Sequence, residues 1–203
     1  MTSLPAPAPR VDRQEPIAPR VDRQERILEA ALRLLAREGI SGVSMRAVAR
    51  AAGVSLGLVN YYFTDKHSLI AASLRRVEAQ DLTIVAPDPS RSPVQQLTEA
   101  LRRVAGDEYL TTEYLSLRLQ LWALAQAHED FAAINAEAQA RYRDGLAELV
   151  GAARPRLTRA ERDQRAADID VIQNGMWLTA LLGIDRAAID RSLARTEEIA
   201  LAP

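Results

Sequence analysis

Cysteine is absent from this chain of 203 residues, and aromatic residues make up only 4% of it. Without cysteine the chain can form neither a disulfide framework nor a thiolate metal site, so a reducing compartment poses no difficulty. Long uncharged apolar runs are also missing, which argues against a membrane span and a signal-peptide core. We therefore expect a soluble, cytoplasmic protein.

Catalytic signatures are equally scarce. The two histidines, His67 and His128, belong to no H-E-x-x-H motif, and the chain has neither a G-x-S-x-G turn nor a glycine-rich phosphate loop. Asp168 and Asp170 are two positions apart, a spacing that points them to different faces of a helix. We predict that the protein is not an enzyme and carries no metal or cofactor.

The net charge of −1 hides an uneven distribution. Residues 23–67 carry seven basic and four acidic side chains, a balance of +3, and residues 1–22 carry three of each sign. Residues 68–203 must therefore carry −4 to give the total of −1. A basic segment followed by an acidic remainder favours a two-part protein whose first part lies against phosphates.

Two short helices with a tight turn between them are predicted at about 44–52 and 55–62. Ser44 and Ser55 are suited to cap these helices, and Gly53 tolerates the positive φ at which the first one must stop. Such a pair forms a helix-turn-helix, whose second helix can enter a DNA major groove. The alternative is a plain helical hairpin that does not contact DNA.

The individual residues make the motif more specific. The pattern A-x-x-A-G-V-S-x-G-x-x-x-x-Y-F-x-x-K-x-x-L, at 49–69, resembles the DNA-binding domain of TetR-family repressors, and the similarity reaches back to Arg23. One position departs from the pattern, because Asn60 stands where the family usually has an aromatic residue. The resemblance implies a dimer that binds a pseudo-palindromic operator and, by family default, represses transcription.

DNA contacts are expected on the exposed face of the second motif helix and at the helix starts. Base or groove contacts are assigned to Leu56, Gly57, Leu58, Asn60 and Tyr61. Arg46 matches the family position that can reach a guanine. Phosphate contacts are assigned to Ser44, Ser55, Tyr62 and Lys66. Lys66 is the only lysine in the chain, which favours a selected phosphate contact over a merely solvated side chain.

The fold class predicted from these patterns is all-α. Residues 1–20 are rich in proline and alanine and are predicted to be a disordered arm, which carries the first copy of a direct repeat and allows minor-groove contact as an alternative role. Residues 21–68 are predicted to form a three-helix DNA-binding domain. Residues 69–203 are predicted to form a larger helical bundle that binds an effector and dimerises.

Helices outside the motif follow from apolar periodicity and from glycine and proline breaks. Their predicted ranges are about 22–37, 65–84, 93–105, 108–127, 129–151, 159–183 and 186–200. The helix at 65–84 belongs to both predicted domains, so it can transmit displacement between them.

Residues 95–200 resemble the C-terminal domain of BetI-type regulators, through Trp122, His128, Tyr142 and the segment 174–178. The resemblance implies a small-molecule effector, with a choline-like quaternary ammonium held by two indole faces and a carboxylate. The candidate effector residues are Tyr109, Glu113, Tyr114, Gln120, Trp122, His128, Phe131, Tyr142, Gln173, Asn174 and Trp177. The alternative is that Trp122 and Trp177 are core residues.

The same resemblance implies that the last two long helices pair with those of a second copy. The candidate interface residues are Ile172, Met176, Thr179, Ala180, Ile184, Ile189 and Leu193, with intrachain core as their alternative role. A further alternative for the whole protein is a dimeric DNA binder without an effector, constitutive or regulated by a protein partner.

Overall fold

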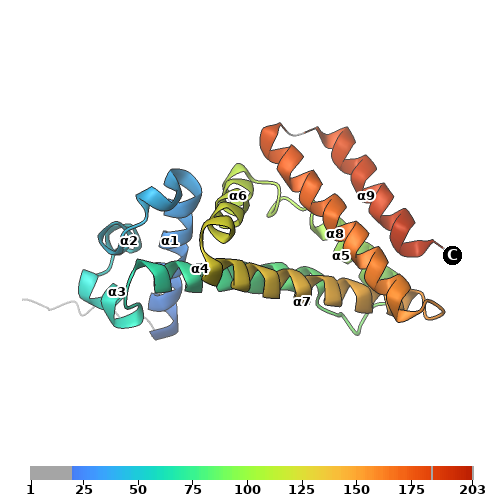
Figure 1. Cartoon of the computed structure of the whole chain (residues 1–203), viewed down its shortest axis with the longest axis horizontal. Helices are drawn as coiled ribbons and strands as arrows, with labels where there is room; N and C mark the ends of the chain where they lie inside the picture. The colour runs from blue at the N-terminus through green and yellow to red at the C-terminus, as the bar shows by residue number, and fades with distance from the viewer. Residues whose placement is uncertain (1–19, 184, 203) are drawn as a thin grey trace, which may run out of the picture.

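The computed structural model describes residues 20–183 and 185–202. Over these residues the chain forms nine α-helices, one short 3-10 helix and no strand, which confirms the predicted all-α class (Figure 1). The predicted arm before Arg20 and the predicted interface residue Ile184 lie outside the described residues. Within them, no helix combines the length and apolar character needed to cross a membrane.

The first three helices form a compact unit at one end of the molecule. They are α1 (Arg20–Gly42), α2 (Met45–Ala52) and α3 (Leu56–Tyr62). Val48, Val59 and Phe63 are buried in the core, and half-buried Val54 packs against that core.

Helix α1 is interrupted close to the position where the sequence predicts its end. A stop near Arg37 was expected because Gly39 follows it, and Gly39 does take a positive φ of 67°. With ψ at −170° this residue lies outside the helical region, so the first helical segment of α1 ends there as predicted, and a second short segment reaches Gly42 beyond the kink.

Helix α4 (Lys66–Leu82) joins the first three helices to the rest of the molecule. Asp65 and Ser68 form a capping box at its start, since the Asp65 carboxylate accepts from the Ser68 N–H and the Ser68 hydroxyl accepts from the Asp65 N–H. Helix α4 packs both on α1 and on the long helix α7 (Glu129–Ala153). The predicted helix continued to about residue 84, but α4 ends at Leu82 and the chain goes on as the 3-10 helix η1 (Thr83–Val85).

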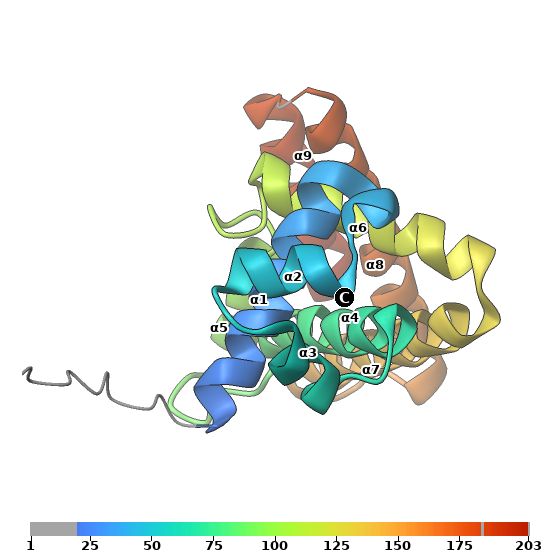
Figure 2. The same ribbon diagram turned by 90° about the vertical axis from the view of Figure 1, so that its left-hand side faces the viewer.

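The remaining helices build the larger bundle. They are α5 (Pro93–Arg103), α6 (Thr112–Ala127), α8 (Arg159–Leu182) and α9 (Arg186–Leu201). Helix α7 packs on α8, α4, α6 and α5, and α6 also packs on α1 of the first unit. Figure 2, turned by 90°, shows α1, α2 and α3 in front of this bundle.

One predicted boundary in the bundle is wrong. The helix expected from 108 begins only at Thr112, because Thr111 takes an extended backbone and its hydroxyl caps the Tyr114 N–H; residues 104–110 form turns that bury Tyr109 and Leu110. The other predicted ends in the bundle lie within two residues of those observed, as at Ala153 of α7 against the predicted residue 151.

Candidate functional site

The helix-turn-helix is fixed by local hydrogen bonds. The Ser44 and Ser55 hydroxyls each accept from the backbone N–H three residues later, at 3.1 Å, and so start α2 and α3. Gly53, at φ 65°, ends α2 in the left-handed conformation. Arg26 of α1 donates from Nη2 to the carbonyl of Ala52 at 2.8 Å, which ties the end of α2 to α1.

Most residues assigned to DNA contact lie on the surface of this unit. The exposed ones are Ser44, Arg46, Ser55, Gly57, Asn60 and Tyr61. Tyr61 is 63% exposed, a large value for an aromatic side chain. The half-buried ones are Leu56, Leu58, Tyr62 and Lys66, and both Leu56 and Tyr62 also pack against the core.

Lys66 makes a contact that its predicted role did not include. Its ammonium donates to the carbonyl of Ile40 at 2.5 Å, across 26 positions of sequence. Ile40 lies in the last turn of α1, where carbonyl groups lack helical partners. Lys66 therefore stabilises the end of α1, and any phosphate it binds shares the ammonium with this carbonyl.

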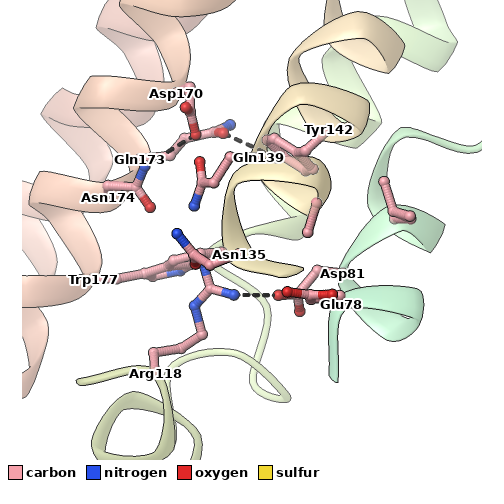
Figure 3. Close-up of a pocket in the computed structure, with 12 residues that line it drawn as sticks. Glu78, Asp81, Arg118, Asn135, Gln139, Tyr142, Asp170, Gln173, Asn174 and Trp177 are labelled. Carbon is pink, nitrogen blue, oxygen red and sulfur yellow. Dashed lines mark hydrogen bonds and ion pairs between the residues drawn. The ribbon is translucent and has the colours of Figure 1, made fainter. Parts of the chain in front are cut away.

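A pocket lies between α4, α6, α7 and α8 (Figure 3). The space that the centre of a water molecule can reach measures about 30 Å³, room for about two waters. Its lining residues are Glu78, Asp81, Leu82, Arg118, Asn135, Ala138, Gln139, Tyr142, Asp170, Gln173, Asn174 and Trp177.

A buried ion pair closes one end of the pocket. Arg118 Nη1 donates to Asp81 Oδ2 at 2.6 Å, and the Tyr114 hydroxyl donates to Asp81 Oδ1 at 2.7 Å. Both members of the pair are more than 90% buried. The pair links α4 to α6, so it couples the wall of the pocket to the helix that joins the two parts of the molecule.

The guanidinium of Arg118 also lies over both tryptophans. Its central carbon is 5.1 Å from the centroid of the Trp177 ring and 5.4 Å from that of Trp122, within the range of cation–π attraction. Arg118 thus occupies the position, between two indoles and a carboxylate, that the sequence resemblance implied for an effector cation.

Three buried side-chain polar atoms of the described residues have no hydrogen-bond partner, and all three belong to this pocket: Glu78 Oε1, Arg118 Nε and Gln173 Nε2. A buried polar atom without a partner costs about 1–3 kcal/mol, so such atoms are uncommon in folded proteins. Their concentration in one pocket indicates a site with unused hydrogen-bonding capacity.

The electrostatics of the pocket are acidic, with three carboxyl groups against one guanidinium. Burial raises the pKa of Glu78 to about 7, although nearby Arg118 opposes the shift. Burial also raises the pKa of Asp170, against the opposing charge of Arg143. A cation that entered the pocket would favour the ionised form of both carboxyl groups.

Four of the candidate effector residues line the pocket: Tyr142, Gln173, Asn174 and Trp177. The Tyr142 hydroxyl donates to Gln173 Oε1 at 2.9 Å, while the Gln173 amide nitrogen has no hydrogen-bond partner. Three more contact residues of the pocket wall, since Tyr109 and Tyr114 lie against Trp177 and the Trp122 ring lies against the Arg118 guanidinium.

The other four candidates do not line this pocket. Glu113 is exposed at the start of α6, and Gln120 lies against Gly39 of α1. His128 and Phe131 lie where α6 meets α7, with Phe131 stacked on His67 of α4 at 4.4 Å between ring centroids.

Six polar pocket residues were not identified from the sequence: Glu78, Asp81, Arg118, Asn135, Gln139 and Asp170. For two of them, Asp81 and Asp170, the sequence pattern could have indicated a buried carboxyl group. Asp81 follows Leu74 and Val77 at helical spacing, so it interrupts an apolar face with a charge, and Asp170 stands beside buried Ile169.

The candidate interface residues divide between core and surface. Met176, Ala180 and Ile189 are buried within the chain, Ile172 and Leu193 are half-buried, and Thr179 is exposed. The large exposed apolar residues of α8 are others: Val171, Leu178 and Leu182, with Val171 at 71% and Leu182 at 83% exposure. Leu178 and Leu182 follow Val171 by seven and eleven positions, so the three side chains lie along one face of the helix.

Comparison with known proteins agrees with both parts of the chain. Residues 27–73 match the model of bacterial regulatory proteins of the tetR family, and residues 93–200 match that of the BetI-type transcriptional repressor, C-terminal. The HTH-type transcriptional regulator BetI of Escherichia coli O139:H28 is 25% identical over 174 residues, which cover 84% of this chain and 87% of that regulator.

Solved structures share the fold. A TetR transcription regulator from Haloarcula marismortui superposes with a TM-score of 0.74 at 19% identity, over 89% of this chain and 97% of the other. A proposed transcriptional regulator from Saccharomonospora viridis, in complex with choline, superposes with a TM-score of 0.66 at 21% identity. The match covers 88% of this chain and 95% of the other.

The two matched family models cover most of the chain, and they agree with the helix-turn-helix geometry and the helical bundle behind it. They confirm the prediction of a regulator that is not an enzyme. The chain belongs to the TetR family of DNA-binding transcriptional regulators and carries a C-terminal region of the BetI type.

Proposed function

We propose that this protein is a cytoplasmic repressor that binds a pseudo-palindromic operator as a dimer and is released by a small molecule. Residues 21–68 are assigned to DNA binding and residues 69–203 to effector binding and dimerisation. The observation that carries the proposal is the path of α4. It begins beside the helix-turn-helix, and its Glu78 and Asp81 stand in the wall of the pocket.

The path of α4 also explains how a bound ligand would release the operator. A ligand that enters the pocket must displace one or more of the four helices around it, because the free space is small, and we propose that α4 or α6 is among those that move. Helices α4 and α6 both pack on α1 of the DNA-binding unit. Movement of either helix therefore changes the spacing between the two recognition helices of a dimer, which must match successive half-sites of the operator.

The dimer is proposed to form through α8 and α9. The exposed face of α8 with Val171, Leu178 and Leu182 supports this proposal, because a second copy packed there would remove large apolar side chains from water. Thr179 and exposed Gly175 lie among them and permit close approach of the two helices.

A DNA binder without an effector remains the second candidate. The small space in the pocket, and the lack of any water-sized space between Trp122, Trp177 and Arg118, favour it. Against it stand the three unpartnered polar atoms of the pocket, which a ligand would satisfy.

The test is a footprint on the promoter region of the protein's own gene, followed by a screen for compounds that release the bound fragment. We expect two protected half-sites related by a two-fold axis, and release by at least one small molecule. A single protected half-site would contradict the dimer. Failure of all compound classes would favour the second candidate.

A further inference from the structure

Some polar groups of the pocket have hydrogen-bond partners within the chain and others do not. The groups without partners indicate the chemistry of the ligand that the pocket can bind. Groups already paired inside the chain are unavailable to a ligand, whereas buried groups without partners gain most from one. Arg118 Nη1, both Asp81 oxygens and the Tyr142 hydroxyl are paired. Glu78 Oε1, Arg118 Nε and Gln173 Nε2 are not.

A quaternary ammonium ion fits this pattern poorly. Such a cation has no N–H group, so it is recognised through aromatic faces and not through hydrogen bonds. Here Arg118 lies 5.1 Å and 5.4 Å from the centroids of Trp177 and Trp122, and its charge is already matched by Asp81. A second cation at these indoles would have to displace the guanidinium or lie against it.

The unused acceptor requires a donor from the ligand. Glu78 Oε1 is buried on α4, and a protonated amine placed there would both fill its hydrogen bond and balance its charge. The remaining carboxyl group, Asp170 on α8, adds to the negative field, although its Oδ1 already accepts from Asn174 at 3.0 Å.

The unused donors require an acceptor from the same ligand. Arg118 Nε comes from α6 and Gln173 Nε2 from α8, and both side chains are more than 90% buried. Figure 3 shows Arg118 and Gln173 among the labelled side chains of the pocket, with Glu78 on the α4 side. A hydroxyl, carbonyl or ether oxygen of the ligand would satisfy these nitrogens.

We propose that the effector is a small organic amine with N–H donors and a neighbouring oxygen acceptor, held by Glu78, Arg118 and Gln173, and not a quaternary ammonium. This inference rests on the proposal that the pocket is the effector site. The amine binds Glu78, the oxygen accepts from Arg118 Nε and Gln173 Nε2, and Arg118 keeps its ion pair with Asp81.

Ethanolamine and choline form a matched pair of probes, because they differ only in whether the nitrogen carries hydrogens or methyl groups. Isothermal titration of the full chain with each probe, to about 10 mM because such small ligands bind weakly, compares them directly. We expect ethanolamine to bind at least about tenfold more tightly than choline, the effect of one hydrogen bond to a charged group.

Two variants locate the contact. Glu78→Gln should weaken ethanolamine at least about tenfold, since it removes the charge. The matched control Glu148→Gln, at an exposed position of α7 outside the pocket, should leave binding unchanged. Arg118→Met frees both indole faces and should strengthen choline binding; the double variant Asp81→Asn/Arg118→Met serves if the single one does not fold.

Equal or tighter binding of choline by the parent chain would overturn the proposal, and so would the absence of ethanolamine binding or its retention in Glu78→Gln. Operator release by a compound of another class, with no response to ethanolamine, would refute the ligand class alone. Absence of operator binding under all conditions would refute the proposed function instead.

Discussion

Arg118 of α6 and Asp81 of α4 form an ion pair of 2.6 Å, more than 90% buried, with the two tryptophan rings close to the guanidinium. The pair holds together the two helices that pack both on the DNA-binding unit and around the pocket. It is therefore both a structural contact and the part of the pocket nearest to any movement that a ligand would cause.

Breaking this ion pair should be costly. Arg118→Met leaves a buried carboxylate without its partner, and we expect the free energy of unfolding to fall by about 3–5 kcal/mol. The double variant Asp81→Asn/Arg118→Met should recover much of the loss, because no unpaired charge is left. Urea unfolding, monitored by circular dichroism, measures the free energy of unfolding of the single and double variants. A loss below about 1 kcal/mol in the single variant would mean that the pair is effectively solvated.

Lys66 and Asn60 should separate two kinds of DNA contact. Lys66→Ala should weaken binding to all sequences about equally and lower the salt slope by about one, whereas Asn60→Ala should lose about 1–3 kcal/mol of discrimination at one base position. Binding titrations at several salt concentrations, with operator and mutated operators, distinguish them.

The contact between Lys66 and the Ile40 carbonyl adds a control. If Lys66 acts only on α1, its variant should lower the free energy of unfolding and leave the salt slope unchanged. If Lys66→Ala and Asn60→Ala both bind DNA as the parent does, the proposed docking of α3 is wrong.

The apolar face of α8 should control assembly. Leu182→Glu places a charge where a second copy is proposed to pack, and we expect light scattering to show a shift from dimer to monomer. Val94→Glu is the matched control, since Val94 is also a large exposed apolar residue but lies on α5. A monomeric parent chain, or a dimeric Leu182→Glu variant, would contradict the proposed interface.

Glu78 should make stability depend on pH. Its pKa is raised from 4.5 to about 7 in the folded chain, so the folded state binds more protons than the unfolded state between these values. The free energy of unfolding should therefore fall as pH rises from about 4.5 to about 7. Glu78→Gln should show a smaller decline when urea unfolding is compared at about pH 5 and about pH 8. An identical decline in both chains would show that Glu78 is not buried as described.

The helix-turn-helix could be predicted from sequence because its determinants are local. Ser44, Gly53 and Ser55 act on backbone groups within a few positions of themselves, so their order along the chain defines the caps and the turn. Gly39 shows the limit of this reasoning. The helix stop at this glycine was predictable, but the short helical segment that continues from it to Gly42 depends on the residues that follow and on packing against Gln120 of α6.

The pocket was only partly predictable, because it combines residues from four helices far apart in sequence. Tyr142 and Gln173 were identified as scarce or polar side chains near the BetI-like segment, and they do meet. Arg118 was missed for the opposite reason. In an arginine-rich chain one more arginine carries no signal, and its role appears only when Asp81 and Trp177 are brought beside it.

Coupling between pocket and DNA is the central claim, and the most direct test is a titration of labelled operator with the full chain, with and without a releasing compound, in the parent and in Glu78→Gln. We predict that the compound weakens operator binding by the parent, and that Glu78→Gln binds the operator as tightly as the parent but no longer responds. An equal response in both chains would contradict the account, because it would show that the compound acts somewhere other than this pocket.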